Sequence, residues 1–361
     1  MEMLVKRSPW DGRRVLVTGH SGFKGGWLAL WLHELGAEVT GFSLPPPTNP
    51  SFFEQVRLAE LVTHIEGDIR DRAAFERAVE MAQPELVFHL AAQPLVRQSY
   101  AEPVETWATN VMGTVHLLDI CRRVKSVRGV VCVTSDKCYE NREWVWPYRE
   151  NDPMGGHDPY SSSKGAAELA IASYRRSYFA ESPLVASVRA GNVIGGGDWA
   201  DDRLVPDIIR AMLAGRSPVI RAPGSVRPWQ HVLDALSGYL LVGERLLDGA
   251  DGAASGWNFG PGEGDTRPVA WIVEEMLRAW GADGWDAPDG PQVHEAKQLR
   301  LDCSKARSEL GWNPRLRLGE ALLRTIEWHR SVADGADARE VSLTQLHEYE
   351  VSMSIGQPQW M

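Results

Sequence analysis

The stretch that most restricts the fold of this chain is a glycine-rich turn close to its start. A short apolar run at 15–17 leads into the sequence TGHSGFKG at 18–25, and an apolar segment follows that ends at Gly36. A continuous apolar run is typical of a parallel strand buried on both faces, and the segment after the turn is typical of a helix. The order of strand, glycine turn and helix predicts the first unit of a parallel α/β sheet.

The same alternation continues over the first half of the chain. Strands are expected at 38–44, 64–68, 86–90, 129–133 and 184–188, and helices at 73–81, 109–124 and 160–179. Such a pattern predicts an α/β fold with a Rossmann-like doubly wound parallel sheet.

The periodicity becomes weak after Arg189, where loop-like stretches dominate. A helix is expected again at 232–247 and a strand at 257–259. We therefore expect two domains. The larger, nucleotide-binding domain comprises 1–188 plus about 231–261, and the smaller comprises 189–230 and 262–361.

Composition and charge narrow the class of protein. With 361 residues, of which 43% are hydrophobic, the chain has enough apolar material for a large core. Its net charge of −10 repels phosphate backbones, so nucleic acid is not an expected partner. The apolar runs are far shorter than the roughly 18 residues of a membrane helix, and the first residues lack the apolar length of a signal peptide. We expect no membrane segment and a cytoplasmic location.

The four cysteines give no sign of a metal centre. Cys121, Cys132, Cys138 and Cys303 show no C-x-x-C spacing, and two of them lie in or beside an expected buried strand. Free core thiols in a reducing compartment are therefore expected, rather than a zinc site or disulfides.

The glycine turn has the spacing and context of a dinucleotide site. Gly19, Gly22 and Gly25 let the backbone approach a pyrophosphate, and the start of the following helix offers free N–H groups. The alternative is a plain strand-to-helix turn. Ser43 stands where many NAD sites place an acid, so the residues alone separate NAD from NADP only weakly. Asp68 fits either a contact to the adenine edge or a simple strand-end acid.

Two further groups of residues can move protons. In YSSSK, Tyr160 and Lys164 share one helix face, and a lysine cation can lower the pKa of a phenol so that it accepts a proton from an alcohol. The strand at 129–133 ends in Thr134-Ser135-Asp136-Lys137, which brings a hydroxyl, a carboxylate and an ammonium to one point. The alternative interpretations are two residues on a helix face and a solvated ion pair in a loop.

Together these residues resemble the extended short-chain dehydrogenase/reductase family. The segments RAGNVIGGGD and RPWQHVLDAL are similar to the nucleotide-sugar segments of that family, and the similarity covers roughly residues 11–315. The resemblance implies NAD as the cofactor of the larger domain and a nucleotide sugar as the ligand of the smaller one. The implied cofactor-binding residues are Gly19, His20, Gly22, Phe23, Lys24, Asp68, Ile69, Leu90, Ala91, Ala92, Gln93, Thr109, Thr134, Tyr160 and Lys164.

Within this family, the sugar-nucleotide 4,6-dehydratases carry a hydroxyl–aspartate–acid/base run at the end of this strand. Relatives that use dTDP- and GDP-sugars have Thr-Asp-Glu, whereas this chain has Ser135-Asp136-Lys137. Lysine in place of glutamate, followed by Cys-Tyr, is similar to the branch that uses CDP-glucose. The segments GFSLPPPTNPSFFE, LAAQPLVRQSY and HEAKQLRLDCSKA point to the same branch.

The resemblance also implies a role for each catalytic residue. Tyr160, helped by Lys164, takes the proton of the sugar 4-hydroxyl, and Ser135 hydrogen-bonds the 4-oxygen. Asp136 is the acid and Lys137 the base of an elimination of water, which requires a protonated carboxyl and a neutral amine. Adjacent residues of a strand face opposite ways, so the loop must twist for both to reach the sugar. The product would be a 6-deoxy sugar of the kind used in surface polysaccharide.

The smaller domain is locally positive. Five arginines and one acid, Asp207, lie between 203 and 227, and guanidinium groups suit the phosphates of a nucleotide sugar. The implied substrate-binding residues are Arg97, Asn192, Val205, Arg221, Arg227 and His231. A solvated helix face for Arg221 and a structural role for His231 are the alternatives. The family resemblance further implies a homodimer, or a dimer of dimers, built on the helices at 109–124 and 160–179.

Other functions remain open at this level. A nucleotide-sugar 4-epimerase would need the glycine turn and the Tyr160/Lys164 pair but no elimination pair, so Asp136 and Lys137 discriminate between them. A dehydratase for another nucleotide-glucose would differ in a few loop contacts to the base. A protein that only binds NAD and a nucleotide sugar would be expected to lack Tyr160, Lys164 or the acid.

Overall fold

The computed structural model describes residues 8–287 and 299–354 of the chain. The outer ends of the two predicted domains, at 1–7 and 355–361, lie outside the described residues, as do 288–298 and with them the first part of HEAKQLRLDCSKA. In the described part, a seven-stranded sheet has the order β3-β2-β1-β4-β5-β6-β9. Its strands are β1 (Arg14–Thr18), β2 (Glu38–Ser43), β3 (Thr63–Glu66), β4 (Leu86–His89), β5 (Gly129–Val133), β6 (Leu184–Ala190) and β9 (Gly256–Phe259).

Every neighbouring pair in this sheet is parallel, with registers such as Val17 opposite Phe88 and Cys132 opposite Ser187. The chain runs outward from β1 to β3, crosses back to β4 and then runs outward on the other side. This is the order of a doubly wound nucleotide-binding sheet, and the predicted α/β Rossmann-like fold is confirmed.

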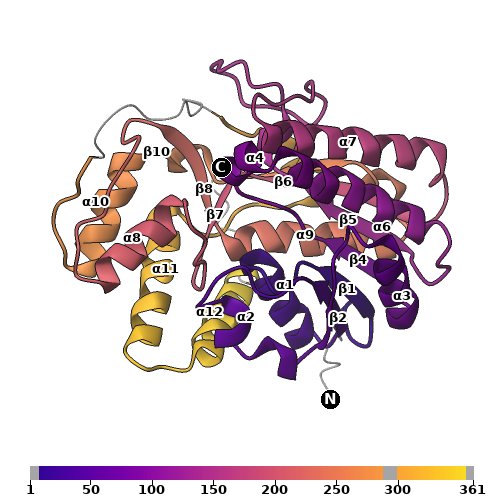
Figure 1. Ribbon diagram of the computed structural model, residues 1–361, viewed down its shortest axis with the longest axis horizontal. Helices are drawn as coiled ribbons and strands as arrows, with labels where there is room; N and C mark the ends of the chain where they lie inside the picture. The colour runs from indigo at the N-terminus through magenta and orange to yellow at the C-terminus, as the bar shows by residue number, and fades with distance from the viewer. Residues whose placement is uncertain (1–7, 288–298, 355–361) are drawn as a thin grey trace.

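Helices cover both faces of the sheet (Figure 1). Alternate strand residues supply the two cores, because side chains of a strand point to opposite faces. Leu16 belongs to the core under α3 (Arg72–Ala82), α6 (Gly113–Cys121) and α7 (Pro159–Ser177). Val15 and Val17 belong to the core under α1 (Phe23–Glu34) and α9 (Val232–Leu247). The near-continuous apolar strands of the sequence follow from this two-sided burial.

The expected helix at 109–124 is shorter and less regular than its sequence indicates. The chain passes from α4 (Val96–Ala101) and α5 (Pro103–Trp107) into a π-helical turn, η2 (Ala108–Met112), before α6 begins. Within that turn the side chain of Asn110 accepts a hydrogen bond from the Gln93 backbone N–H at 2.8 Å and donates to the Gln93 carbonyl at 3.0 Å. Widened turns of this type occur often at functional sites.

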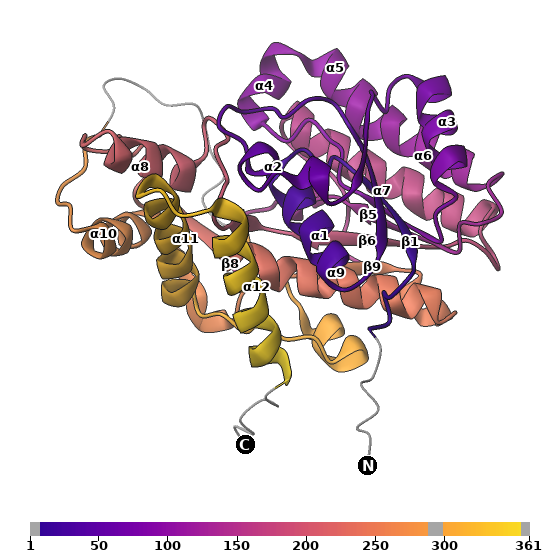
Figure 2. The same ribbon diagram turned by 90° about the horizontal axis from the view of Figure 1, so that it is seen from below.

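The second half of the chain adds a smaller three-stranded sheet, β10-β8-β7, beside the large one. Its strands are β7 (Asn192–Ile194), β8 (Val226–His231) and β10 (Thr266–Pro268). Its helices are α8 (Leu204–Leu213), α10 (Val269–Trp280), α11 (Leu318–Ala333) and α12 (Ala338–Ser354), and Figure 2 shows α11 beside α12. The remaining short helices are α2 (Phe52–Gln55), η1 (Leu58–Glu60), η3 (Asp136–Cys138), η4 (Asp251–Ala253), η5 (Glu263–Asp265) and η6 (Ala306–Leu310).

The sheet order reverses between β1 and β4, which places a crevice at the carboxyl ends of the strands. The residues that follow β1, β4, β5 and β6 all reach this crevice, and the smaller sheet lies beside it. Within the described ranges, no helix combines the length and the hydropathy needed to cross a membrane.

Candidate active site

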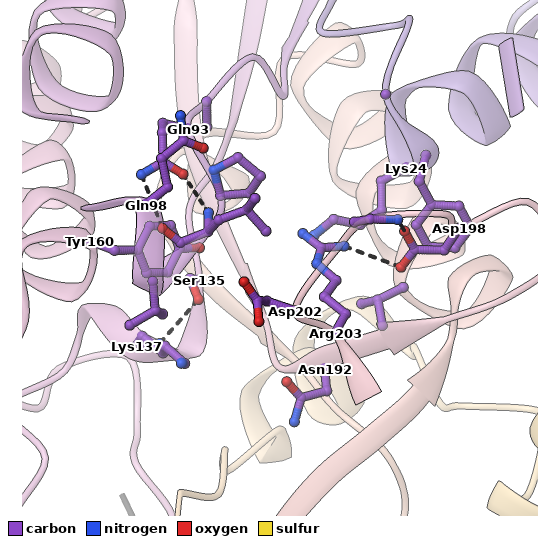
Figure 3. Close-up of a pocket in the computed structure, with 18 of the residues that line it drawn as sticks. Lys24, Gln93, Gln98, Ser135, Lys137, Tyr160, Asn192, Asp198, Asp202 and Arg203 are labelled. Carbon is purple, nitrogen blue, oxygen red and sulfur yellow. Dashed lines mark hydrogen bonds and ion pairs between the residues drawn. The ribbon is translucent and has the colours of Figure 1, made fainter. Parts of the chain in front are cut away.

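A cavity of about 1410 Å³ fills the crevice between the two sheets. Single small-ligand pockets have volumes of roughly 300–1,000 Å³, so this cavity has room for two ligands. Its walls come from the glycine turn after β1, the ends of β4 and β5, the start of α7, and the segments around β7, α8 and β8. Figure 3 shows Ser135, Tyr160 and Lys137 on one side and Asn192, Asp198 and Arg203 on the other.

The glycine turn fits a pyrophosphate because three of its positions carry no side chain. Gly19 has a φ of +76°, and a Cβ there would lie 2.7 Å from the Ala91 nitrogen. A Cβ at Gly25 would lie 2.1 Å from the Gly19 carbonyl oxygen. A Cβ at Gly22 would instead make an ordinary contact, 3.4 Å from the Gly19 carbonyl oxygen. As the N-cap of α1, Gly22 has no capping side chain, so the first N–H groups of a 12-residue helix are available to an anion.

The predicted cofactor-binding residues line the cavity, with one exception. The His20 side chain is fully buried beneath the turn, where its ring nitrogens lie 3.1 Å from the Ser43 hydroxyl and 2.7 Å from His64. His20 therefore supports the turn from below and does not face a ligand through its side chain. At the far end of the site, the Asp68 carboxylate accepts hydrogen bonds from the Arg70 guanidinium, at 2.6 Å for the shortest.

Tyr160 and Lys164 lie on the first turns of α7 and both line the cavity. The backbone N–H of Tyr160 donates to the Ser99 hydroxyl at 3.1 Å, and the Lys164 ammonium lies 3.5 Å from the Val133 carbonyl. Burial raises the pKa of Tyr160 to about 12, although a hydrogen bond with Ser135 acts in the opposite direction. Burial lowers the pKa of Lys164 to about 8. The pKa of the phenol is thus not lowered as expected from the sequence, because burial outweighs the hydrogen bond with Ser135 and the charge of Arg203.

The turn after β5 allows the adjacent residues Asp136 and Lys137 to reach the same cavity. The chain leaves the extended conformation at Ser135 and forms the short helix η3, so Asp136 and Lys137 are not on opposite faces of a strand. Both line the cavity. Ser135 caps the turn, since its hydroxyl accepts from the Lys137 N–H at 3.2 Å and donates to Asp136 at 3.0 Å. Burial raises the pKa of Asp136 despite the nearby Lys137 cation, which favours the protonated acid.

A buried ion pair holds this turn in place. Glu168 of α7 accepts hydrogen bonds from Arg189 of β6 at 2.7 Å, from Ser187 at 2.8 Å and from the Thr134 hydroxyl at 2.5 Å. Both charged side chains are at most 5% exposed. The cluster ties α7 to the ends of β5 and β6, so Tyr160 and Ser135 approach each other on a rigid frame. Because the Thr134 hydroxyl points into the cluster, Thr134 reaches the cavity mainly through its other atoms.

On the substrate side, the structure separates one predicted residue from the rest. Arg97, Asn192, Val205, Arg221 and Arg227 line the cavity. His231 does not. It is fully buried, its Nδ1 accepts from the Leu233 N–H at 3.3 Å, and it caps α9. The His231 ring therefore stabilises the start of α9, which is the structural role that the sequence left open as an alternative to substrate binding.

Several residues that line the cavity or support its wall were not singled out by the sequence. Asn110 joins Gln93 to the Ser163 hydroxyl at 2.9 Å and so fixes the loop after β4 against α7. The stretch GGGDWADDR supplies Asp198, Asp202 and Arg203, of which Asp198 and Arg203 form an ion pair at 3.2 Å. The high density of charged residues in that stretch could have predicted a binding role, whereas nothing in the sequence indicates a role for Asn110. The described residues hold no group of three or more His, Cys, Asp or Glu side chains placed for a metal ion.

Comparison with known proteins identifies the class. Residues 15–254 match the NAD dependent epimerase/dehydratase family, and the chain belongs to it. A curated CDP-glucose 4,6-dehydratase from Salmonella typhimurium is 52% identical over 96% of this chain and 98% of its own length. A UDP-glucose 4-epimerase from Mycolicibacterium smegmatis is 30% identical over 88% of this chain and 99% of its own.

The solved structure of a dTDP-glucose 4,6-dehydratase from Streptomyces venezuelae, with NAD and TYD bound, superposes with a TM-score of 0.76. It is 26% identical and covers 88% of this chain and 97% of its own. The expected membership of the extended short-chain dehydrogenase/reductase family is confirmed.

Proposed function

We propose that the protein is a CDP-glucose 4,6-dehydratase that uses NAD and converts CDP-glucose to CDP-4-keto-6-deoxyglucose and water. The observation that carries this proposal is that one cavity holds both the Tyr160/Lys164 pair and the Asp136-Lys137 turn. The first pair suits the oxidation of an alcohol, and the second suits the elimination of water from the ketone that results. The 52% identity to a curated enzyme of this activity supports the choice of substrate.

The glycine turn and the strand ends after β1, β3 and β4 are the residues that would hold NAD. When bound, NAD supplies a hydride acceptor that takes the hydride of sugar carbon 4 and later returns it to carbon 6. Tyr160 accepts the proton of the 4-hydroxyl, and Ser135, which hydrogen-bonds Tyr160, orients the same oxygen. Lys164 contributes a cation that favours the phenolate once the site is filled.

The elimination uses the turn after β5. The ketone at carbon 4 acidifies the proton on carbon 5, and Lys137 removes it. Asp136, whose pKa burial raises, donates its proton to the 6-hydroxyl, and that oxygen leaves as water. When the hydride arrives at carbon 6, Lys137 returns a proton to carbon 5. The proton that Tyr160 took from the 4-hydroxyl is then released and Asp136 takes one up from solvent, so the sum of all steps is the loss of one water with no net change in the cofactor or the protein.

The nucleotide is held by arginines on both walls of the cavity. Arg227 lines the cavity, and its charge acts against the burial that raises the pKa of Asp136. Arg97, Asn192, Val205 and Arg221 also line the cavity. One guanidinium group can donate two parallel hydrogen bonds to two phosphate oxygens, and this geometry suits the diphosphate of a nucleotide sugar.

A 4-epimerase is the second candidate, because a UDP-glucose 4-epimerase is 30% identical over most of the chain. Epimerization needs Tyr160 and the cofactor but neither an acid nor a base at carbons 5 and 6. The placement of Asp136 and Lys137 on the cavity wall would then have no use, which favours the dehydratase.

A substrate panel tests the proposal. The purified chain with NAD would be incubated separately with CDP-, dTDP-, GDP- and UDP-glucose, and each product would be weighed by mass spectrometry. We expect the loss of one water from CDP-glucose and no change in the others. An isomer of unchanged mass would identify the protein as an epimerase. Water loss from another nucleotide-glucose would mean that the substrate carries a different base. No product from any substrate would favour a protein that only binds NAD and a nucleotide sugar.

The proposed assembly is a homodimer, or a dimer of such dimers. The layer formed by α4 to α7 exposes large apolar side chains, among them Trp107 at 41%, Met112 at 47% and Leu169 at 61%. An apolar patch of this kind is typical of a protein interface. We also place the enzyme in the cytoplasm, since its four cysteines are buried free thiols of the type found in reducing compartments.

A further inference from the structure

Asp202 connects the two walls of the cavity. Its Oδ1 lies 3.1 Å from Nη1 of Arg97, which belongs to α4 on the side of the large sheet. The same oxygen lies 3.0 Å from Nη1 of Arg221, which follows α8 on the side of the smaller sheet. All three residues line the cavity, and in the view of Figure 3 Asp202 stands between Ser135 and Arg203.

The neighbouring acids of the same loop behave differently. Asp198 pairs with Arg203 at 3.2 Å, and Asp201 pairs with Arg210 at 3.3 Å, so each stays within its own segment. Asp202 is the acid of this loop that crosses the cavity, and it holds two guanidinium groups with one oxygen atom. Its backbone has a φ of 58°, a left-handed conformation that aspartate and asparagine adopt more readily than most residues.

The two ion pairs are well formed but weakly held. The side chains of Arg97 and Asp202 are 48% and 44% exposed, and that of Arg221 is 25% exposed. Ion pairs this accessible to water contribute little to stability, since solvent screens them. Two guanidinium groups that share one carboxylate oxygen would form more hydrogen bonds with a diphosphate, because a diphosphate carries several negative oxygens.

We propose that Arg97 and Arg221 form a phosphate subsite for the nucleoside diphosphate, and that Asp202 occupies this subsite until the nucleotide sugar displaces it. The subsite rests on the proposed function, because it requires a ligand with phosphates in this cavity. Asp202 then competes with the phosphates of the substrate for both guanidinium groups.

Binding measurements on the full-length protein with NAD test this exchange. The affinities of CDP and of cytidine would be compared by calorimetry in the wild type, Asp202→Asn and Asp202→Gly, both of which tolerate the left-handed backbone. We expect CDP to bind about threefold to tenfold more tightly in both variants, because a pair of weak ion pairs no longer has to be broken. Cytidine lacks the phosphates, so its affinity should not change.

The matched control is Asp201→Asn, which removes the same charge one residue away but leaves Arg97 and Arg221 paired. It should leave both affinities unchanged. The reverse test is Arg97→Gln, which should weaken CDP binding and leave cytidine binding as it is. The exchange is refuted if Asp202→Asn leaves CDP binding unchanged or weakens it, if cytidine tightens equally, or if Asp201→Asn has the same effect.

A wrong substrate and a wrong role for Asp202 would give different results. If the protein prefers a different base, another nucleoside diphosphate will bind more tightly than CDP, and the proposed substrate is wrong. The Asp202 comparison is then made with that nucleoside diphosphate and its nucleoside, and the expected ratio is the same.

Discussion

Asp136 and Lys164 have pKa values shifted in opposite directions by one cause. Both side chains are buried in the wall of the same cavity, and burial disfavours the charged form of each. The carboxyl of Asp136 therefore tends to keep its proton, as an acid in catalysis must. Lys164, with a pKa of about 8, keeps its charge at neutral pH by a small margin. Burial thus favours the proposed role of Asp136, whereas it weakens the cation that the proposed role of Lys164 requires.

Replacement of Asp136 by asparagine should separate the two halves of the reaction. An asparagine has nearly the same shape but no acidic proton, so the oxidation at carbon 4 proceeds and the loss of water slows by about 100- to 10,000-fold. Reduced nicotinamide should then accumulate on the protein after CDP-glucose is added, visible by its absorbance. In Tyr160→Phe, by contrast, no reduced nicotinamide should form. Equal rates of water loss in Asp136→Asn and the wild type would rule out Asp136 as the acid.

At the scale of elements, the turn between β1 and α1 combines two kinds of glycine. Gly25 is needed by the fold, since its Cβ would collide with the Gly19 carbonyl. Gly22 lines the cavity, and an added Cβ there would make only an ordinary contact with the Gly19 carbonyl oxygen. The same residue type therefore serves packing at one position and ligand approach at the other.

Alanine substitutions should distinguish these two uses. Gly25→Ala should lower the stability by several kcal/mol or prevent folding, since backbone atoms must move to admit the methyl group. Gly22→Ala should fold with a melting temperature close to that of the wild type but retain much less NAD after purification. Thermal unfolding and the NAD content of the purified protein report the two effects. A fully loaded Gly22→Ala protein would contradict the pyrophosphate site.

The sequence predicts regular elements well and side-chain directions poorly. The strands of the large sheet, α7 and α9 follow from apolar periodicity, because burial fixes their pattern. The π-turn η2, α8 and β8 were not expected. The shape of η2 depends on distant partners, such as the Asn110 contact with Ser163, and α8 and β8 lie in the loop-rich stretch after Arg189, where the periodicity is weak. For the same reason, the sequence could not show that His231 points into the core or that Asp202 reaches Arg97 across 105 positions.

At the scale of the whole molecule, a buried acid joins the C-terminal segment to the layer of α9. Asp234 accepts hydrogen bonds from the Arg315 N–H at 2.7 Å and from the Tyr349 hydroxyl of α12 at 2.8 Å. Burial raises its pKa to about 6. Because the folded state binds this proton more tightly than the unfolded state, the contribution of Asp234 to stability is greatest below pH 4 and falls as the pH rises through about 6.

Urea unfolding of the wild type and Asp234→Asn at two pH values tests this linkage. Between about pH 5 and about pH 7.5, the wild type should lose roughly 1 kcal/mol of unfolding free energy relative to the variant, since the asparagine does not ionise. Other titrating groups cancel in the difference between the two proteins. A difference that stays constant over this range would show that Asp234 has an ordinary pKa.

The most direct test of the central claim follows the hydrogen on carbon 4 of the sugar. CDP-glucose labelled with deuterium at carbon 4 would be converted by the protein, and the position of the label in the product would be read by NMR. Internal oxidation, elimination and reduction predict that the deuterium moves to carbon 6 and that carbon 5 acquires hydrogen from solvent. Deuterium that remains on carbon 4, or is lost to water, would contradict the account of one cavity that joins Tyr160 to the Asp136-Lys137 turn.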